Sequence, residues 1–112
     1  MSESKDEQGQ LLKGSLGVLL LSIVESAPSH GYAIISELER RSNGALRLAE
    51  GTVYPALYRL EKQGLLESQR AVVDGRQRRM YTITNKGKAA LGEGAKTWRA
   101  FARGVSAVLE TT

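Results

Sequence analysis

An apolar repeat in the last third of the chain constrains the fold more than any other feature of the sequence. Apolar residues follow one another at intervals of four and three positions, at Leu91, Ala95, Trp98, Ala102, Val105 and Leu109. This spacing is typical of a helix with one continuous apolar seam. Thr84 is a good N-cap, and a helix from there to about Glu110 spans roughly 40 Å at about 1.5 Å per residue. A domain of this size has a radius of gyration of only about 13 Å, so the helix is expected to extend beyond its own core and to need a partner.

The composition indicates one small globular domain with a mildly basic surface. The chain has 112 residues, of which 41% are hydrophobic and 25% charged, and its formal net charge is +4. A basic balance favours nucleic acid as a partner. The longest apolar run, residues 18–21, is far too short to cross a bilayer, and no signal peptide precedes it, so a cytoplasmic protein with no membrane contact is expected.

The first part of the chain predicts a polar tail and two helices. Residues 1–10 are polar without periodicity and are expected to form a flexible tail. Residues 11–26 predict a helix that is apolar on two sides, so one side can cover the core and the other needs something else to cover it. Pro28 ends this pattern, and a second helix is expected from Ser29 or His30 to Ser42. A chain reversal follows at residues 43–44.

The stretch "EGTVYPALYRLEKQGLL", residues 50–66, predicts a third helix with a proline near its front. If the helix starts near Gly51 or Thr52, Pro55 falls in the first turn, where its missing N–H has no helical partner in any case. If it starts near Ala49, Pro55 lies inside the helix, and the carbonyl of Gly51 loses its partner. The residues alone leave both alternatives open.

A β-hairpin follows the third helix. Residues 65–73 predict a strand, residues 74–75 (Asp-Gly) a tight turn, and residues 79–83 the returning strand. Three helices followed by a hairpin form the winged helix-turn-helix plan, in which the third helix enters the major groove. We therefore expect a mainly α fold with a small β-hairpin, in which residues 11–83 form a DNA-binding domain and residues 84–112 a dimerisation helix.

The side chains of these elements supply candidate DNA contacts. With Val53, Leu57 and Leu60 facing inward, the third helix leaves outward or at the border Thr52, Tyr54, Pro55, Tyr58, Arg59 and Lys62. The hairpin contributes Arg70, Arg76, Arg78 and Arg79, and residues 59–79 hold six basic residues against three acidic ones. Such groups bind phosphates and base edges, although a solvated charged hairpin is the simpler alternative. Tyr32 is expected either to pack beneath the third helix or to turn its hydroxyl toward a phosphate.

Three separated motifs carry a family resemblance. "HGYAI" (residues 30–34), "EGTVYPALYRLEKQGLL" (50–66) and "GRQRRMYTITNKGKAAL" (75–91) together resemble the PadR family of bacterial transcriptional regulators. With one helix after the wing, the chain is similar to the smaller subfamily that includes multidrug-sensing repressors. The resemblance implies a homodimer held by the first and last helices on a palindromic operator. It also implies a third helix that starts near Ala49, with Tyr54 and Pro55 facing DNA.

The resemblance also implies a role for Trp98. In multidrug-binding members a tryptophan on the last helix lines a pocket at the dimer centre, and Trp98 stands at the matching position. One alternative is an interface core residue. The other is a pocket for a small hydrophobic or aromatic effector, lined also by Phe101, Ser15 and Val18, with Leu11 on the same outer side of the first helix. No acidic residue lies within a turn C-terminal to Trp98, which does not favour cationic drugs.

Catalysis, metals and cofactors are not expected. The chain has no cysteine and one histidine, His30, whose ring is expected to bond local backbone at a turn rather than a metal. It has no Gly-rich phosphate loop and no Ser/His/Asp order. The sequence thus favours a homodimeric repressor of a nearby promoter. The alternative is a winged-helix ligand-binding or protein-interaction module without operator recognition, and an RNA-binding winged helix is a third hypothesis.

Overall fold

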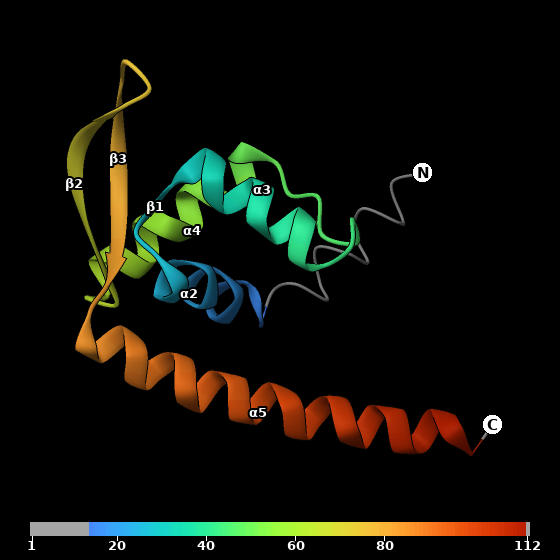
Figure 1. The fold of residues 1–112 in the computed structure, drawn as a ribbon. Helices are drawn as coiled ribbons and strands as arrows, with labels where there is room; N and C mark the ends of the chain where they lie inside the picture. Colours follow the sequence, from blue (N-terminus) through green and yellow to red (C-terminus); the bar gives the residue numbers. More distant parts are fainter. Residues whose placement is uncertain (1–13, 112) are drawn as a thin grey trace.

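The computed structural model describes residues 14–111 and has the predicted winged-helix architecture (Figure 1). The elements in chain order are α2 (Leu16–Ser26), β1 (Ser29–His30), α3 (Gly31–Arg41), α4 (Glu50–Lys62), β2 (Leu66–Val73), β3 (Arg76–Ile83) and α5 (Asn85–Glu110). The expected tail at residues 1–10, and Leu11 in the expected first helix, lie outside the described residues. The mainly α fold with a small antiparallel sheet and a long C-terminal helix is confirmed.

The start of the second helix was predicted wrongly. Ser29 and His30 form a short strand that pairs with Tyr81 and Met80, so the sheet has three strands in the order β1-β3-β2. Helix α3 begins one residue later, and His30 is its N-cap, with ring Nδ1 accepting a hydrogen bond from the N–H of Ala33 at 3.3 Å. The expected local role of the histidine ring is therefore confirmed.

The hairpin is longer than its sequence pattern indicates. Asp74 and Gly75 both have positive φ, 52° and 76°, as a tight two-residue turn requires. The ladder continues to the turn, where Val73 pairs with Arg76, so β3 starts at residue 76 rather than at the expected residue 79. This part of β3 consists of consecutive polar residues, so a search for apolar periodicity does not detect the strand.

The core lies between α2, α3, α4 and the base of the sheet. Its most deeply buried side chains are Leu20, Ile34, Val53, Leu57 and Leu66. The second side of α2 is partly covered by the chain itself, since Val18 packs against α5. A Cβ at Gly94 would lie 2.5 Å from Val18 Cγ2, so this close approach requires glycine. Helix α5 therefore supplies part of the cover that the sequence indicated for this side of α2.

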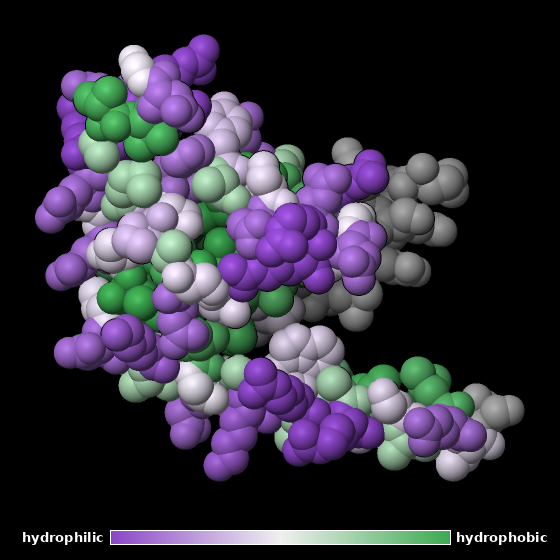
Figure 2. Space-filling view, viewed as in Figure 1, coloured by the Kyte–Doolittle hydropathy of each residue, from purple (hydrophilic) through white to green (hydrophobic). Residues whose placement is uncertain are grey.

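Helix α5 extends well past the domain, as predicted. It has 26 residues from Asn85, and its N-cap is Thr84, whose side chain accepts a hydrogen bond from Gly87 N–H at 2.9 Å. Its first turns pack beneath the body and its C-terminal half stands free (Figure 1). Figure 2 shows hydrophobic side chains on that free end, which Val105, Val108 and Leu109 supply. Leu91 is buried in the core of its own domain. The start of the apolar seam therefore packs within the chain, and only the later part, from Trp98 onward, is exposed.

Candidate nucleic-acid interface

Helix α4 starts early enough to place Pro55 inside it. Its N-cap is Ala49, whose carbonyl accepts hydrogen bonds from the N–H groups of Thr52 and Val53. Pro55 is therefore past the first turn, which decides between the two alternatives left open by the sequence. Because proline has no N–H, the carbonyl of Gly51 lacks its regular helical partner at the front of α4.

One face of α4 is open, with a basic end. Val53, Ala56, Leu57 and Leu60 are buried. The opposite face exposes Thr52, Pro55, Tyr58, Arg59 and Lys62. Tyr58 is 60% exposed, and the Lys62 ammonium lies 5.5 Å from its ring centroid. These five positions lie on the surface as predicted, in a form that can contact a nucleic acid.

Tyr54 differs from the other predicted contacts on α4 because it is half-buried. Its ring end lies where a Cβ at Gly31 would be, only 2.4 Å from Tyr54 Cζ. The ring also meets that of Tyr32 edge-on, with centroids 6.3 Å apart. Burial, together with the nearby Tyr32 and Glu50, raises the pKa of the Tyr54 hydroxyl. The expectation that Tyr54 stands on the open face is therefore only partly correct, because its ring packs between α4 and the start of α3.

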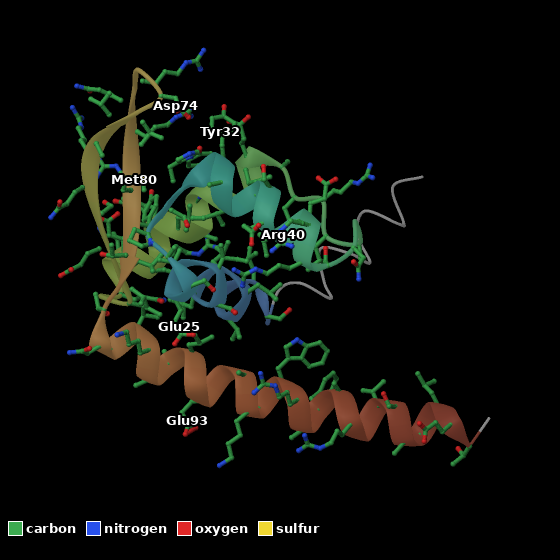
Figure 3. The ribbon with its side chains drawn as sticks, viewed as in Figure 1. Glu25, Tyr32, Arg40, Asp74, Met80 and Glu93 are labelled. Carbon is green, nitrogen blue, oxygen red and sulfur yellow. The ribbon has the colours of Figure 1, made fainter. Side chains whose placement is uncertain are left out.

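Tyr32 joins three elements of the interface. Its hydroxyl donates to Glu50 Oε1 at 3.1 Å, and the guanidinium of Arg78 lies 4.9 Å from its ring centroid. Figure 3 shows Tyr32 between the hairpin and the helical body, on the same side of the molecule as Asp74 at the hairpin turn. The ring packs as the first sequence alternative expected, although 44% of the residue stays exposed, and the contact of the hydroxyl with a phosphate stays a prediction. Sequence reasoning missed Glu50, whose only signal was an acidic residue at the start of α4.

The hairpin carries arginines on both faces. Arg70 pairs with Arg79 across the ladder, and alternation puts Arg76 and Arg78 on the other face. Arg70, Arg76 and Arg79 are exposed, whereas Arg78 is half-buried. Arg78 Nε is buried without a hydrogen-bond partner among residues 14–111. Arg78 is thus held at the joint with α3, and the other arginines are better placed to meet a phosphate.

A polar relay ties the wing to α4. Arg79 donates to Ser68 Oγ at 2.9 Å, and Ser68 donates to Glu61 Oε2 at 2.7 Å. The relay links β3, β2 and the C-terminal half of α4 in sequence. It fixes the hairpin relative to the helix, so the two elements can present their cations as one surface.

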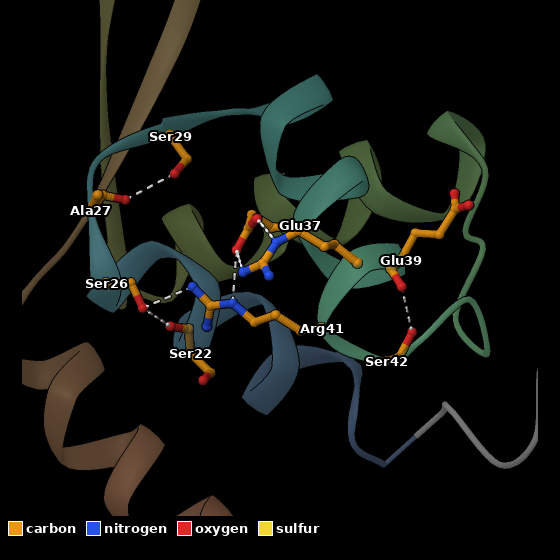
Figure 4. A network of polar contacts seen from close by, with 9 residues as sticks. Ser22, Ser26, Ala27, Ser29, Glu37, Glu39, Arg41 and Ser42 are labelled. Atoms are coloured by element: carbon orange, nitrogen blue, oxygen red, sulfur yellow. Dashed lines mark hydrogen bonds and ion pairs between the residues drawn. The ribbon is translucent and has the colours of Figure 1, made fainter.

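A second network holds α3 against α2 (Figure 4). Glu37 accepts hydrogen bonds from Arg40 at 2.6 Å and Arg41 at 2.8 Å, and Arg41 also donates to Ser26 Oγ at 3.0 Å. Hydrogen bonds from the two guanidinium groups lower the pKa of the Glu37 carboxyl to about 2. Exposed ion pairs stabilise a fold only weakly, so this network serves to orient the helices more than to stabilise them.

The free part of α5 carries a separate apolar surface. Trp98 and Phe101 lie with ring centroids 5.9 Å apart. Beyond them a depression of about 400 Å³ is lined by Phe101, Gly104, Val105, Val108 and Leu109. Ala95 and Ala102 are half-buried on this helix, as are Ser15 and Val18 near the start of α2. The predicted interface residues within the described chain therefore fall on α2 and α5, away from the hairpin turn.

Other kinds of site find no support in the described residues. No group of three His, Cys, Asp or Glu side chains within residues 14–111 could hold a metal ion. Over the same residues, every helix is too short or too polar to span a membrane.

Comparisons with known proteins agree on one family. The sequence model of the transcriptional regulator PadR-like family matches residues 20–93. The transcriptional regulator Rv3488 of Mycobacterium tuberculosis (strain ATCC 25618 / H37Rv) is 46% identical over 76 residues, covering 68% of this chain and 68% of that protein. A PadR family transcriptional regulator from Eggerthella lenta DSM 2243 has a TM-score of 0.79 at 31% identity and covers 99% of this chain and 96% of its own. A PadR-like transcriptional regulator (BC4206) from Bacillus cereus strain ATCC 14579 has a TM-score of 0.77 at 31% identity and covers 89% and 96%.

Proposed function

This chain belongs to the PadR-like family of transcriptional regulators, and from that premise we propose that it represses a nearby promoter as a homodimer on a palindromic operator. Members of this family regulate transcription by binding DNA and are not enzymes. The observation that carries the proposal is the open face of α4 beside the wing. Tyr58, Arg59 and Lys62 are exposed on α4, and Arg70 and Arg76 are exposed on the hairpin.

The chemistry of this surface suggests different roles for its basic part and for the front of α4. Guanidinium and ammonium groups neutralise phosphates without reading sequence, so the wing and the end of α4 would supply affinity. The front of α4 would supply specificity, because the N-terminal residues of a recognition helix reach the base edges. Tyr32 contacts both the Tyr54 ring and the Glu50 carboxylate at the front of α4, and these contacts would limit the freedom of this part of the helix before DNA binds.

The exposed end of α5 supports the proposed homodimer. Phe101, Val108 and Leu109 are each more than 60% exposed, and Trp98 and Val105 are about 40% exposed. An apolar stripe of this kind on a helix that leaves its own domain needs a partner of similar chemistry, and a second copy offers the same stripe. Two copies joined there would present two recognition helices, as half-sites about 34 Å apart require.

Trp98 supports a second proposal, relief of repression by a small hydrophobic or aromatic effector. A ligand between the protomers would change the separation of the two recognition helices, which couples its binding to that of DNA. Flat aromatic compounds added to the purified protein are expected to quench the fluorescence of Trp98, the only tryptophan, and to lower operator affinity together. Fluorescence that stays unquenched at millimolar concentrations would leave Trp98 as a dimer-core residue, and quenching without loss of operator affinity would show a bound compound that does not regulate DNA binding.

The decisive experiment is an electrophoretic shift on the DNA upstream of the protein's own coding sequence. A specific complex on one palindrome, resistant to excess random duplex, is expected. Sequence-indifferent, salt-sensitive binding alone would instead favour the ligand-binding or protein-interaction module. Competition by single-stranded RNA but not by duplex DNA would favour an RNA-binding winged helix.

Arg76 is expected to supply a phosphate contact that carries no sequence information. Arg76→Ala should lower affinity for operator and random duplex alike and reduce the slope of log K against log salt by roughly one per protomer. The control is Arg103→Ala, which removes an equal charge from the exposed side of α5. Equal slopes for Arg76→Ala and the native protein would remove this wing tip from the interface.

A further inference from the structure

We infer that the carboxylate of Glu50 reads one base of each half-site, by accepting a hydrogen bond from the N4 amino group of a cytosine. This inference rests on the proposed operator binding and adds to it a base and a residue. Glu50 is not among the α4 residues that the sequence predicted as DNA contacts, and it is not part of the basic wing. A carboxylate is unfavourable close to DNA phosphates, so its position on this surface calls for an explanation.

The position of Glu50 is that of a reading residue. It is the first residue of α4 and is exposed. The N-terminal residues of a recognition helix in the major groove contact base edges, while residues farther along meet the backbone. Among base edges there, the cytosine amino group is the donor that glutamate and aspartate side chains accept.

Neighbouring side chains hold the Glu50 carboxylate in place. The Tyr32 hydroxyl donates to Oε1 at 3.1 Å, which leaves Oε2 as an acceptor for a further donor. Tyr32 in turn is held between the Arg78 guanidinium, 4.9 Å from its ring centroid, and the edge contact with Tyr54. A reading group whose partner is itself fixed by packing loses little freedom on binding, and its geometry discriminates more sharply.

The charge of Glu50 distinguishes the recognition of a base from a general effect on DNA affinity or folding. No ion pair within residues 14–111 neutralises Glu50, because the described pairs join Glu37 and Glu39 to arginines of α3 and the following loop. An unpaired carboxylate repels every phosphate equally, which weakens binding to all sequences. That cost is recovered only on a sequence that places a donor opposite it, so the residue acts against wrong sites as well as for the right one. A carboxylate that only stabilises the start of α4 would affect folding and not base preference.

The test is selection of operators from a random duplex pool by the native protein, Glu50→Gln, Glu50→Ala and Tyr32→Phe. The native protein is expected to select cytosine at one symmetric position. Glu50→Ala should lower the preference for cytosine there by about tenfold, and Glu50→Gln should shift it toward adenine, whose edge pairs with an amide. Tyr32→Phe should weaken the same preference without changing the base. Glu93→Gln, which removes an equal charge from an exposed site on α5, is the control and should change nothing.

Each other outcome has a distinct meaning. Equal gains of affinity on all sequences for Glu50→Ala would show that the carboxylate only repels phosphates, and would overturn the inference. Unchanged base preference in the Glu50 variants, with a native protein that still selects an operator, would overturn it and leave the proposed function intact. A native protein that selects no sequence would overturn both. Circular dichroism of each variant establishes that the fold is kept.

Discussion

Gly31→Ala is expected to give a folded protein that binds its operator at least about tenfold more weakly, a loss of about 1.4 kcal/mol. The new Cβ would lie 2.4 Å from Cζ and the hydroxyl of Tyr54, closer than any real contact, so the ring must move. Gly31 is the first residue of α3 and is buried, whereas the obstructing atoms are the far end of a side chain. The helices can therefore stay in place while the Tyr54 ring moves onto the exposed face of α4.

The control for Gly31→Ala is the same substitution at Gly92. This glycine lies within α5, and no neighbouring atom of residues 14–111 comes within 4 Å of its added Cβ, so alanine there should stabilise the helix by about 0.5–1 kcal/mol and leave operator binding unchanged. Thermal unfolding and operator titration of both variants measure the two effects. Removing the ring as well, in Gly31→Ala with Tyr54→Ala, should restore the stability of Tyr54→Ala alone. If Gly31→Ala binds the operator normally, the packing of Tyr54 against α3 is irrelevant to recognition.

The parts of the fold that the sequence predicted are those set by local pattern. Apolar spacing and an N-cap were sufficient for α5, and an Asp-Gly pair was sufficient for the hairpin turn. Strand β1 was missed because two residues are too few to show an alternation of apolar and polar side chains. Its pairing depends on Tyr81 and Met80, some fifty residues later. The early part of β3 was missed because its exposed arginines do not alternate in hydrophobicity.

The interface shows the same division between local and tertiary information. Tyr58 and Lys62 lie on the open face of α4, where helical periodicity predicted them. Tyr54 lies at the border of that face, and only the approach of Gly31 from another helix decides that its ring is covered. Arg78 was expected among the free arginines of the wing, yet it packs on Tyr32. No local pattern distinguishes it from Arg76, because the difference lies in which neighbour the twist of the hairpin brings to it.

Val105→Glu is expected to convert the proposed dimer to monomers and to weaken operator binding by at least about 100-fold. Val105 lies at the centre of the exposed apolar stripe of α5, between Phe101 and Leu109. A carboxylate there would be buried at the dimer contact without a partner, which is costly for any apolar interface. Two linked half-site contacts exceed the affinity of either one by about 10² to 10⁴, and a monomer loses that gain without losing any DNA-contacting residue. Analytical ultracentrifugation and operator titration measure the two losses on the same sample.

The matched control is Lys96→Gln, which changes the net charge by the same amount on the exposed opposite side of α5. Position 96 is two and a half helical turns before position 105, so the two side chains point in opposite directions. Lys96→Gln should remain a dimer with native operator affinity. Because the apolar side chains at the end of α5 are exposed and not part of the domain core, Val105→Glu should keep full binding to an isolated half-site. A variant that stays dimeric, or a monomer that binds the full operator as tightly as the native protein, would contradict the proposal that α5 joins two recognition helices.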